Sequence, residues 1–274
     1  MAPRTLSWQE PDGLSKLAYM YVVYLGVVYG LDTHICLVIN RHAILQLATS
    51  MEYKAIVLGG TGAVGRELIK LLAASNRCNG VVALTRRPIA SSAYATTFPG
   101  LQNETKLVVD AVDFDKLKLD DFAKHNADAC FSCLGTTRAD AGSDAAFIKV
   151  DLEYVSNAAA LCKQAKIPYF GLLSASNAAK DSWFLYPRTK GLAEDAIEKT
   201  HFVRTGIFRP GMINRGHLAR TAERIGNVLL PSFTVSAAAI ARAMMADYEA
   251  NAHAGTTIVS MAEIKSLETK QDFA

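Results

Sequence analysis

The sequence predicts an α/β fold in which a parallel sheet carries helices on both faces, the doubly wound arrangement. Two observations predict it. Short apolar runs bounded by turn residues alternate with helical patterns from residue 51 onward. The first of these runs also passes directly into a glycine-rich turn and then into a helical pattern, within residues 54–72. Right-handed crossovers between such strands place ligands at the carboxyl ends of the strands.

The predicted elements follow in chain order. Strands are expected at residues 56–58, 81–84, 106–109, 129–134, 169–173, 202–208 and 256–260. Helices are expected at residues 64–72, 144–166, 186–197 and 236–248, and the first shows Val64, Leu68, Leu71 and Leu72 at helical spacing. The least regular part is residues 212–235. We expect the substrate pocket there, within a small irregular C-terminal region that spans residues 212–274.

Composition limits the classes of function. The chain has 274 residues, of which 50% are hydrophobic, enough for one large α/β domain or a domain with an appendage. The formal net charge of +3 is too small to indicate a nucleic-acid partner. Five cysteines, odd in number and scattered, indicate a reducing compartment. Cys130 and Cys133 form a C-x-x-C pair, but side chains three apart on a strand point to opposite faces, so no metal site is expected.

Residues 1–50 are expected to lie outside the fold, which leaves residues 51–274 as the domain. Residues 17–31 are apolar and uncharged, but Asp32 and His34 interrupt the run before it reaches the roughly 20 residues of a membrane span. A basic start and a cleavage site are both missing, so a secretory signal is not indicated. Three interpretations stay open: a weak membrane anchor through residues 17–39, an organelle-targeting extension, or sequence upstream of a natural start at Met51. The position of Met51 directly before the first strand favours the last.

The glycine-rich turn carries the pattern of a dinucleotide-binding loop. Gly60, Gly62 and Gly65 match G-x-G-x-x-G, and Gly59, Gly62 and Gly65 match its short-chain dehydrogenase variant. One glycine makes the tight turn, one lets the backbone approach a pyrophosphate, and one lets the helix pack on the strand. The helix N-terminus offers N–H groups and a positive dipole to the phosphates. With a strand before and a helix after, the motif predicts a Rossmann fold that binds a nicotinamide dinucleotide.

The end of the second predicted strand indicates which dinucleotide is bound. NAD-specific folds place a carboxylate there to hold the ribose hydroxyls. This chain has Thr85-Arg86-Arg87-Pro88 instead. The guanidinium groups of Arg86 and Arg87 suit a 2′-phosphate, which arginine binds in bidentate fashion. The sequence therefore predicts NADP(H), with a solvated basic turn as the alternative.

Tyr186 and Lys190 form a Y-x-x-x-K pair at the start of a predicted helix. The spacing places both side chains on one face, one turn apart. A lysine ammonium beside a phenol lowers the phenol's pKa, which favours proton transfer, and it can also hold the nicotinamide ribose. Ser174 and Ser176 follow the fifth strand, and either hydroxyl could bond a substrate carbonyl. The alternative for these serines is strand-end turn chemistry.

With these motifs in order, the chain resembles an atypical or extended short-chain dehydrogenase/reductase. Four segments resemble one branch, the Tat-interacting-protein-like oxidoreductases, whose fungal members are mitochondrial. They are residues 132–138 (Ser-Cys-Leu-Gly-Thr-Thr-Arg), 150–155, 184–191 and 208–211 (Phe-Arg-Pro-Gly). The resemblance covers residues 53–260.

The resemblance implies particular contacts with NADPH. These come from Thr61, Gly62, Ala63 and Val64 in the loop, Arg86 and Arg87 at the 2′-phosphate, Leu134 and Gly135 after the fourth strand, and Tyr186, Lys190, Ile213 and Arg220 further along. Two departures stand out. Ala175 occupies the place of a second serine that the family tends to carry. The asparagine that many short-chain enzymes carry in the long helix is not evident; Asp151 and Asn157 lie there, and the sequence gives neither a role.

Two functions stay open from the sequence. The first is an NADPH-dependent oxidoreductase that acts on a carbonyl or alcohol of a small, partly hydrophobic substrate, with Tyr186 exchanging the proton. The second is an NADPH-binding regulatory protein with a protein partner and little turnover, because fold and cofactor binding do not establish catalysis. The Tyr186/Lys190 pair favours the enzyme. We expect a cytoplasmic protein, with a mitochondrial or membrane-associated location as the alternative.

Overall fold

The computed structural model describes residues 52–214, 233–250, 254–269 and 272. The chain divides into two units, residues 1–51 and 52–274, and the first of them lies outside the described residues. The expected N-terminal extension therefore stays a prediction. Among the helices of the described residues, none has the length and apolarity that a membrane crossing requires.

The main sheet of the described residues confirms the predicted doubly wound fold. Its strands are β1 (Tyr53–Leu58), β2 (Cys78–Thr85), β3 (Leu107–Ala111), β4 (Ala129–Ser132), β5 (Tyr169–Leu173), β6 (Arg204–Phe208) and β9 (Gly255–Val259). They lie in the order β3-β2-β1-β4-β5-β6-β9, and every neighbouring pair is parallel. The strand order reverses between β1 and β4. A crevice for a ligand is therefore expected at the carboxyl ends of these two strands.

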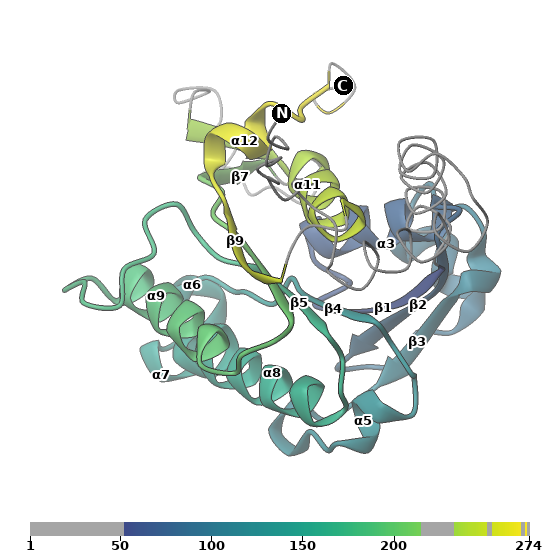
Figure 1. Cartoon of the computed structure of the whole chain (residues 1–274), viewed down its shortest axis with the longest axis horizontal. Coiled ribbons are helices and arrows are strands. Elements are labelled where there is room, and N and C mark those ends of the chain that lie inside the picture. The colour runs from purple at the N-terminus through teal and green to yellow at the C-terminus, as the bar shows by residue number, and fades with distance from the viewer. Residues whose placement is uncertain (1–51, 215–232, 251–253, 270–271, 273–274) are drawn as a thin grey trace, which may run out of the picture. The chain divides into compact units, whose positions relative to one another are not determined.

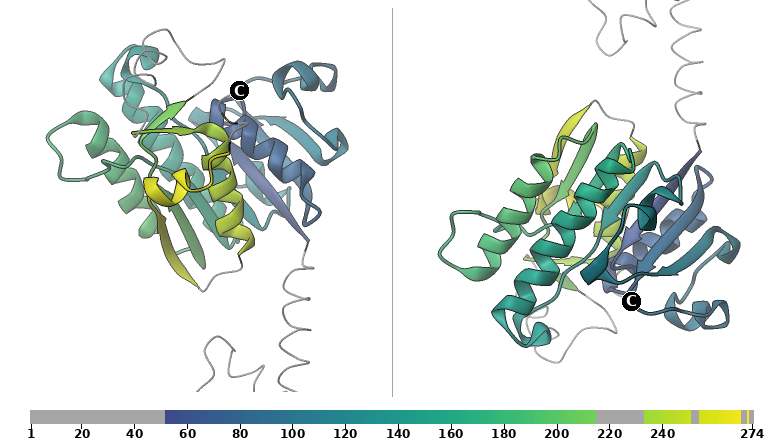
Figure 2. Two further views of the ribbon diagram at one scale, coloured as in Figure 1. Left: turned by 90° about the horizontal axis from the view of Figure 1, so that it is seen from above. Right: turned by 90° about the horizontal axis from the view of Figure 1, so that it is seen from below.

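Helices cover both faces of the sheet (Figure 1), and each layer is seen face-on in Figure 2. On one face, α3 (Ala63–Ala74) and α11 (Ala237–Glu249) enclose the α3/α11 core. On the other, α5 (Asp120–Ala123), α8 (Tyr154–Gln164) and α9 (Leu185–Glu198) enclose the α8/α9 core. Strand β1 supplies Val57 to the first core and Ile56 to the second, as the two-residue period of a strand requires. Burial on both faces explains why the central strands β1, β2, β4, β5 and β6 read as nearly continuous apolar runs.

The cysteine pair confirms this division of the sheet. Cys130 is buried in the α8/α9 core, whereas Cys133 packs against the α3/α11 core. The four cysteines that the structure describes are all free thiols. No cluster of metal-ligating side chains occurs among residues with described positions.

The helix expected over residues 144–166 is interrupted. Its middle, Lys149–Glu153 (η4), winds as a π-helix between α7 (Asp144–Ile148) and α8. A π-turn adds one residue to a helical turn, which changes the direction of the side chains without breaking the helix. Residues on either side of the π-turn keep ordinary helical spacing of their apolar side chains, so the sequence does not reveal the extra residue. Asp151 lies in this turn and is 1% exposed.

Several short elements were not predicted. Strands β7 (Met212–Asn214) and β8 (Thr234–Ser236) pair in parallel as a second small sheet, and α12 (Met261–Lys265) follows β9. The loops contain the short helices α4 (Tyr94–Thr97) and α6 (Arg138–Ala141) and the 3₁₀ turns η1 (Ser91–Ala93), η2 (Glu104–Lys106) and η3 (Phe114–Lys116). Elements of three to five residues are too short to show a period.

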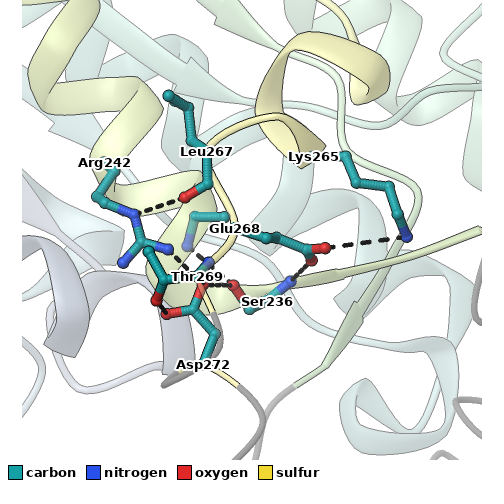
Figure 3. A network of polar contacts seen from close by, with 8 residues as sticks. Ser236, Arg242, Lys265, Leu267, Glu268, Thr269 and Asp272 are labelled. Carbon is teal, nitrogen blue, oxygen red and sulfur yellow. Dashed lines mark hydrogen bonds and ion pairs between the residues drawn. The ribbon is translucent and has the colours of Figure 1, made fainter.

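The last described residues are tied to the start of α11 by a polar network (Figure 3). Ser236 Oγ accepts the Ala239 N–H at 3.0 Å, as the N-cap of α11, and donates to Asp272 Oδ2 at 2.9 Å. The Ser236 N–H donates to Glu268 Oε1 at 2.9 Å. Arg242 donates to the Leu267 carbonyl at 2.9 Å and also binds Asp272. One serine therefore joins β8, α11 and the C-terminal segment.

Replacing this serine is expected to destabilise the domain. Ser236→Ala removes a helix N-cap and the bond to Asp272, and we expect a loss of about 1–2 kcal/mol in the free energy of unfolding. Urea denaturation followed by circular dichroism measures it. The control is Ser143→Ala, which removes the N-cap of α7, a bond to the Ala146 N–H at 3.1 Å, with no link to the C-terminal segment. Equal losses in the two variants would show that the bond to Asp272 contributes nothing.

Candidate functional site

The turn between β1 and α3 has the geometry that its glycines predict. Gly59 has a φ of 72°, in the left-handed region that favours glycine. The Gly62 N–H donates to the Gly59 carbonyl at 3.0 Å, and Gly62 is the N-cap of α3. A Cβ on Gly65 would lie 2.3 Å from the Gly59 carbonyl oxygen, so only glycine lets α3 begin this close to the loop. The N–H groups of the first helical turn, which have no partner within the helix, therefore start directly at the end of β1.

A cavity of about 510 Å³ runs along the carboxyl edge of the sheet from this loop. The structure brings six of the predicted cofactor residues together in its lining: Gly59, Thr61, Gly62, Arg86, Leu134 and Gly135. They come from three places that are distant in sequence: the glycine loop, the end of β2 and the loop after β4. Parallel strands bring these three places to one edge of the sheet, which is why they meet.

The remaining predicted cofactor residues with described positions are not part of the cavity lining. Val64 and Gly65 are buried and Ala63 packs against the core, so these three could meet a ligand through backbone N–H groups. Arg87 is exposed, and its carbonyl accepts the Thr85 hydroxyl at 2.7 Å. Ile213 lies in β7 and packs against the α3/α11 core. Arg220 lies outside the described residues.

A second cavity of about 420 Å³ adjoins the first on the β3 side. Arg86, Phe114 and Tyr154 line both. The Tyr154 ring lies 5.6 Å from that of Phe114, and its hydroxyl donates to Asp115 at 2.7 Å. Sequence reasoning predicted Arg86 but missed Phe114, Asp115 and Tyr154 as lining residues. The available signal was position, because Phe114 follows β3, the neighbour of β2, and Arg86 directly follows β2.

Lys190 is buried on α9 directly behind the loop after β4. Its Nζ lies 2.8 Å from Asp151 Oδ1 and 3.5 Å from the Leu173 carbonyl. A Cβ on Gly135 would lie 3.7 Å from this Nζ, so the ammonium adjoins the cavity lining. The second oxygen of Asp151 accepts the Thr136 N–H at 2.8 Å. Asn157, the other helix residue without a predicted role, is exposed.

Tyr186 stands in the first turn of α9, one turn before Lys190. Its side chain is 43% exposed, and its ring centroid lies 5.9 Å from that of Phe147. Trp183 and Phe184 directly precede the helix and are 95% and 77% exposed. Tyr186 is outside the lining of the two cavities.

Ser174 is buried at the end of β5, and its hydroxyl donates to Glu194 on α9. Glu194 also accepts two bonds from Arg209, from Nε at 3.0 Å and from Nη2 at 2.5 Å. The hydrogen bonds that Arg209 donates to Glu194 raise the pKa of its guanidinium. Ser176 is exposed, and its N–H donates to the Pro210 carbonyl at 2.8 Å. The two candidate serines therefore stand in opposite environments, one committed to a buried network and one open to solvent.

Cys133 lines the first cavity but is a poor nucleophile. Burial raises the pKa of its thiol to about 12, and its sulfur lies 3.9 Å from that of Met244. A thiol with so high a pKa carries almost no thiolate at neutral pH. Cys133 is therefore no candidate for the proton chemistry of this site.

Comparison with known proteins agrees with this geometry. Residues 54–180 match the family model described as semialdehyde dehydrogenase, NAD binding domain. Protein HTATIP2 of Rattus norvegicus is 36% identical over 179 residues, which cover 64% of this chain and 69% of that protein. The mitochondrial protein FMP52 of Candida albicans is 33% identical over 180 residues, which cover 62% of this chain and 74% of that protein.

Solved structures agree in fold. UDP-glucuronic acid 4-epimerase from Bacillus cereus, in complex with UDP-glucuronic acid and NAD, superposes with a TM-score of 0.60 at 16% identity and covers 76% of this chain and 77% of that one. UDP-N-acetylglucosamine 4-epimerase from Methanobrevibacter ruminantium gives 0.58 at 14% identity, with 77% of both chains covered. Both the glycine loop and the parallel sheet are thus those of a nicotinamide-dinucleotide fold, and the expected branch is confirmed. The chain belongs to the family of HTATIP2 and FMP52, proteins built on an NAD(P)-binding Rossmann fold.

Proposed function

We propose that this protein is an NADP(H)-dependent oxidoreductase of the short-chain dehydrogenase type that acts on a carbonyl or alcohol. One observation carries the proposal. The glycine loop, Arg86 and Gly135 lie along a single cavity, and the ammonium of Lys190 adjoins its Gly135 end. An extended dinucleotide needs hydrogen-bond donors to its phosphates in the middle and a polar group at each end. In this cavity the glycine loop would serve the phosphates, and Arg86 and Lys190 would serve the two ends.

The residues present fit the cofactor. At Gly65 the loop leaves no room for a Cβ, which is the close approach that a pyrophosphate-binding turn requires. At the end of β2, residues 85–88 contain two arginines and no carboxylate, and Arg86 is exposed in both cavities. Arg86 would hold the 2′-phosphate, with Arg87 beside it on the same turn. A carboxylate at this position would repel that phosphate.

The bound nicotinamide would supply or accept a hydride. Tyr186 would give a proton to the substrate oxygen, or take one from it, in step with that transfer. Lys190 would bind the nicotinamide ribose with its ammonium. Ser176 and Ser174 are the alternatives for the hydroxyl that holds the substrate oxygen, and Ser174 would have to leave Glu194 to do so. The exposed rings of Trp183 and Phe184 beside Tyr186 support a substrate that is partly hydrophobic.

The preference for NADP(H) is tested by titration. The wild-type protein should bind NADPH at least about tenfold more tightly than NADH, because a bidentate bond between arginine and phosphate is a strong charge-assisted one. Arg86→Ala should remove that difference by weakening NADPH alone. The matched control is Arg188→Ala, which removes an exposed guanidinium on α9. Equal affinity of the wild-type protein for NADH and NADPH would refute the preference.

A second function has its own support. Ser174 donates to Glu194, and Tyr186 stands outside the lined cavity, which suits a protein that senses NADPH and acts on a protein partner. A panel of aldehydes, ketones and quinones, with NADPH consumption as the readout, separates the two functions. Consumption of NADPH supports the oxidoreductase. Tight binding of NADPH without consumption across the panel supports the regulatory protein.

Relatives also bear on location. FMP52 proteins of Debaryomyces hansenii and Candida albicans carry the word mitochondrial in their names. This supports the mitochondrial alternative for the present chain over the cytoplasmic location that its composition suggests. Subcellular fractionation of the full chain tests the mitochondrial location. Recovery of the protein in the cytosolic fraction would contradict it.

A further inference from the structure

We propose that Asp151 is a positioning residue for Lys190: its two carboxylate oxygens hold the lysine ammonium and the cavity edge in one fixed arrangement at the nicotinamide end of the crevice. The inference rests on the proposed function for the role of Lys190. It adds a residue to which neither the sequence nor the resemblance assigns a part.

The contacts of this carboxylate join three separate elements. Oδ1 lies 2.8 Å from Lys190 Nζ on α9, and Oδ2 accepts the N–H of Thr136, after β4, at 2.8 Å. Asp151 itself lies in the π-turn η4. A Cβ on Gly135 would lie 3.4 Å from Asp151 Oδ1 and 3.7 Å from Lys190 Nζ, so the ion pair sits directly behind the residue that lines the cavity.

Because both side chains are buried, the ion pair determines where the Lys190 ammonium lies. The side chains of Lys190 and Asp151 are 7% and 1% exposed. A buried charge without a partner is strongly unfavourable, and a lysine has a flexible four-carbon stem that can carry its head elsewhere. Besides its ion pair with Asp151, the ammonium donates to the Leu173 carbonyl at 3.5 Å, which is a weak hydrogen bond. Without the carboxylate, Lys190 would therefore leave this position.

The π-turn explains how Asp151 acts without touching the ligand. Lys149 and Val150, its neighbours in the turn, line the cavity, whereas Asp151 does not. The extra residue of the π-turn directs Asp151 inward, toward Lys190 and Thr136. Single π-turns of this kind occur frequently at functional sites. Any effect of Asp151 on cofactor binding must therefore pass through Lys190 or through the Thr136 edge.

The donor count of the ammonium leaves room for a ligand. A lysine ammonium has three N–H donors. One of them donates to the Leu173 carbonyl at 3.5 Å, while Asp151 Oδ1, 2.8 Å from the nitrogen, is its ion-pair partner. A donor of the ammonium would then bind a hydroxyl of the nicotinamide ribose. In this arrangement Asp151 holds the ammonium in place by its charge.

The test compares two ligands on one variant. Asp151→Asn keeps the size of the side chain but replaces one acceptor by an N–H₂ donor, which must face either the ammonium or the Thr136 N–H. We expect the Kd for NADP⁺, measured by calorimetry, to rise about tenfold, the loss of one charge-assisted hydrogen bond. The Kd for adenosine 2′,5′-bisphosphate, which lacks the nicotinamide half, should change by less than about twofold. General destabilisation would weaken both ligands, so the difference reports on the position of Lys190.

Two further variants keep the test decisive if Asp151→Asn folds poorly. Asp151→Asn combined with Lys190→Met removes both charges of the pair, and its NADP⁺ affinity should equal that of Lys190→Met alone, because no ammonium remains to be placed. The control is Asp195→Asn, which breaks ion pairs with Lys180 and Lys199 on the exposed side of α9. It should leave both affinities unchanged.

The outcomes separate this inference from the function on which it rests. Equal weakening of NADP⁺ and the bisphosphate by Asp151→Asn, unchanged binding of both, or additive effects in the double variant would each overturn the positioning role. The positioning role would also be overturned if the wild-type protein binds both ligands and every variant binds them with the same affinities. A wild-type protein that binds neither ligand would instead refute the proposed cofactor.

Discussion

Tyr186→Phe is expected to lower the rate of NADPH consumption by about a thousandfold, the middle of the range for losing a general acid–base group. The phenol is the proton source that the proposed reaction requires. The substitution keeps the ring, and so its contact with Phe147 at 5.9 Å. The affinity for NADPH should stay within about twofold of the wild-type value, because the hydroxyl adds no contact with the cavity lining. Single-turnover kinetics with a carbonyl that the wild-type protein reduces measure the rate.

Tyr248→Phe is the matched control for this prediction. It also removes one phenolic hydroxyl, but its ring lies among Tyr53, Phe131 and Tyr169, where the strands begin. Turnover should survive in Tyr248→Phe and fail in Tyr186→Phe. Wild-type turnover in Tyr186→Phe would exclude this tyrosine as the proton donor and, with it, the proposed mechanism.

Gly65→Ala is expected to weaken NADPH binding by about a hundredfold and to lower the free energy of unfolding by about 2 kcal/mol. The added Cβ would lie 2.3 Å from the Gly59 carbonyl oxygen and 2.8 Å from the Gly60 Cα. Both atoms belong to the backbone, so the loop must move away from α3 to admit the methyl group. The movement separates the helix N-terminus from the turn that is proposed to carry the pyrophosphate. Calorimetric titration and urea denaturation measure the two effects.

Gly80→Ala controls for the loss of a glycine as such. Its Cβ would meet the flexible side chain of Lys54, at 3.2 Å, in place of backbone. Gly80 lies in β2, away from the loop, so NADPH affinity should not change. Should Gly65→Ala bind NADPH like the wild-type protein, the pyrophosphate would have to lie somewhere other than on this turn.

The sequence predicted those parts of the fold that local chemistry determines. Gly62 and Gly65 are required by backbone atoms of Gly59 and Gly60, within a few residues. The central strands β1, β2, β4, β5 and β6 are apolar on both faces because both faces are covered. Each of these features leaves a direct mark in the sequence. Arg86 was predicted from the arginines at the end of the second strand, whereas Leu134 and Gly135 were implied by the resemblance to the family; the parallel sheet brings all three to one edge. Element ends differed by a few residues, as with β1, which begins at Tyr53 and was expected from Ile56.

The parts that could not be predicted depend on contacts between distant residues. Asp151 meets Thr136 and Lys190 only because a π-turn changes its direction, and an apolar period does not reveal a single inserted residue. The bond from Ser174 to Glu194 likewise joins β5 to α9, and a serine at a strand end gives no sign of it. Arg220 falls outside the described residues, so its predicted contact stays a prediction.

The contacts of Ser236 couple the stability of three parts of the domain, because this residue ends β8, caps α11 and binds Asp272. Strand β8 is paired with β7, where Ile213 stands opposite Val235. A ligand that stabilises β7 therefore also stabilises the attachment of the C-terminal segment. Linkage is reciprocal, so detaching that segment would weaken such a ligand by the same factor. Occupancy of such a ligand's site and exposure to proteases of the segment that Ser236 holds would then be two measures of one equilibrium.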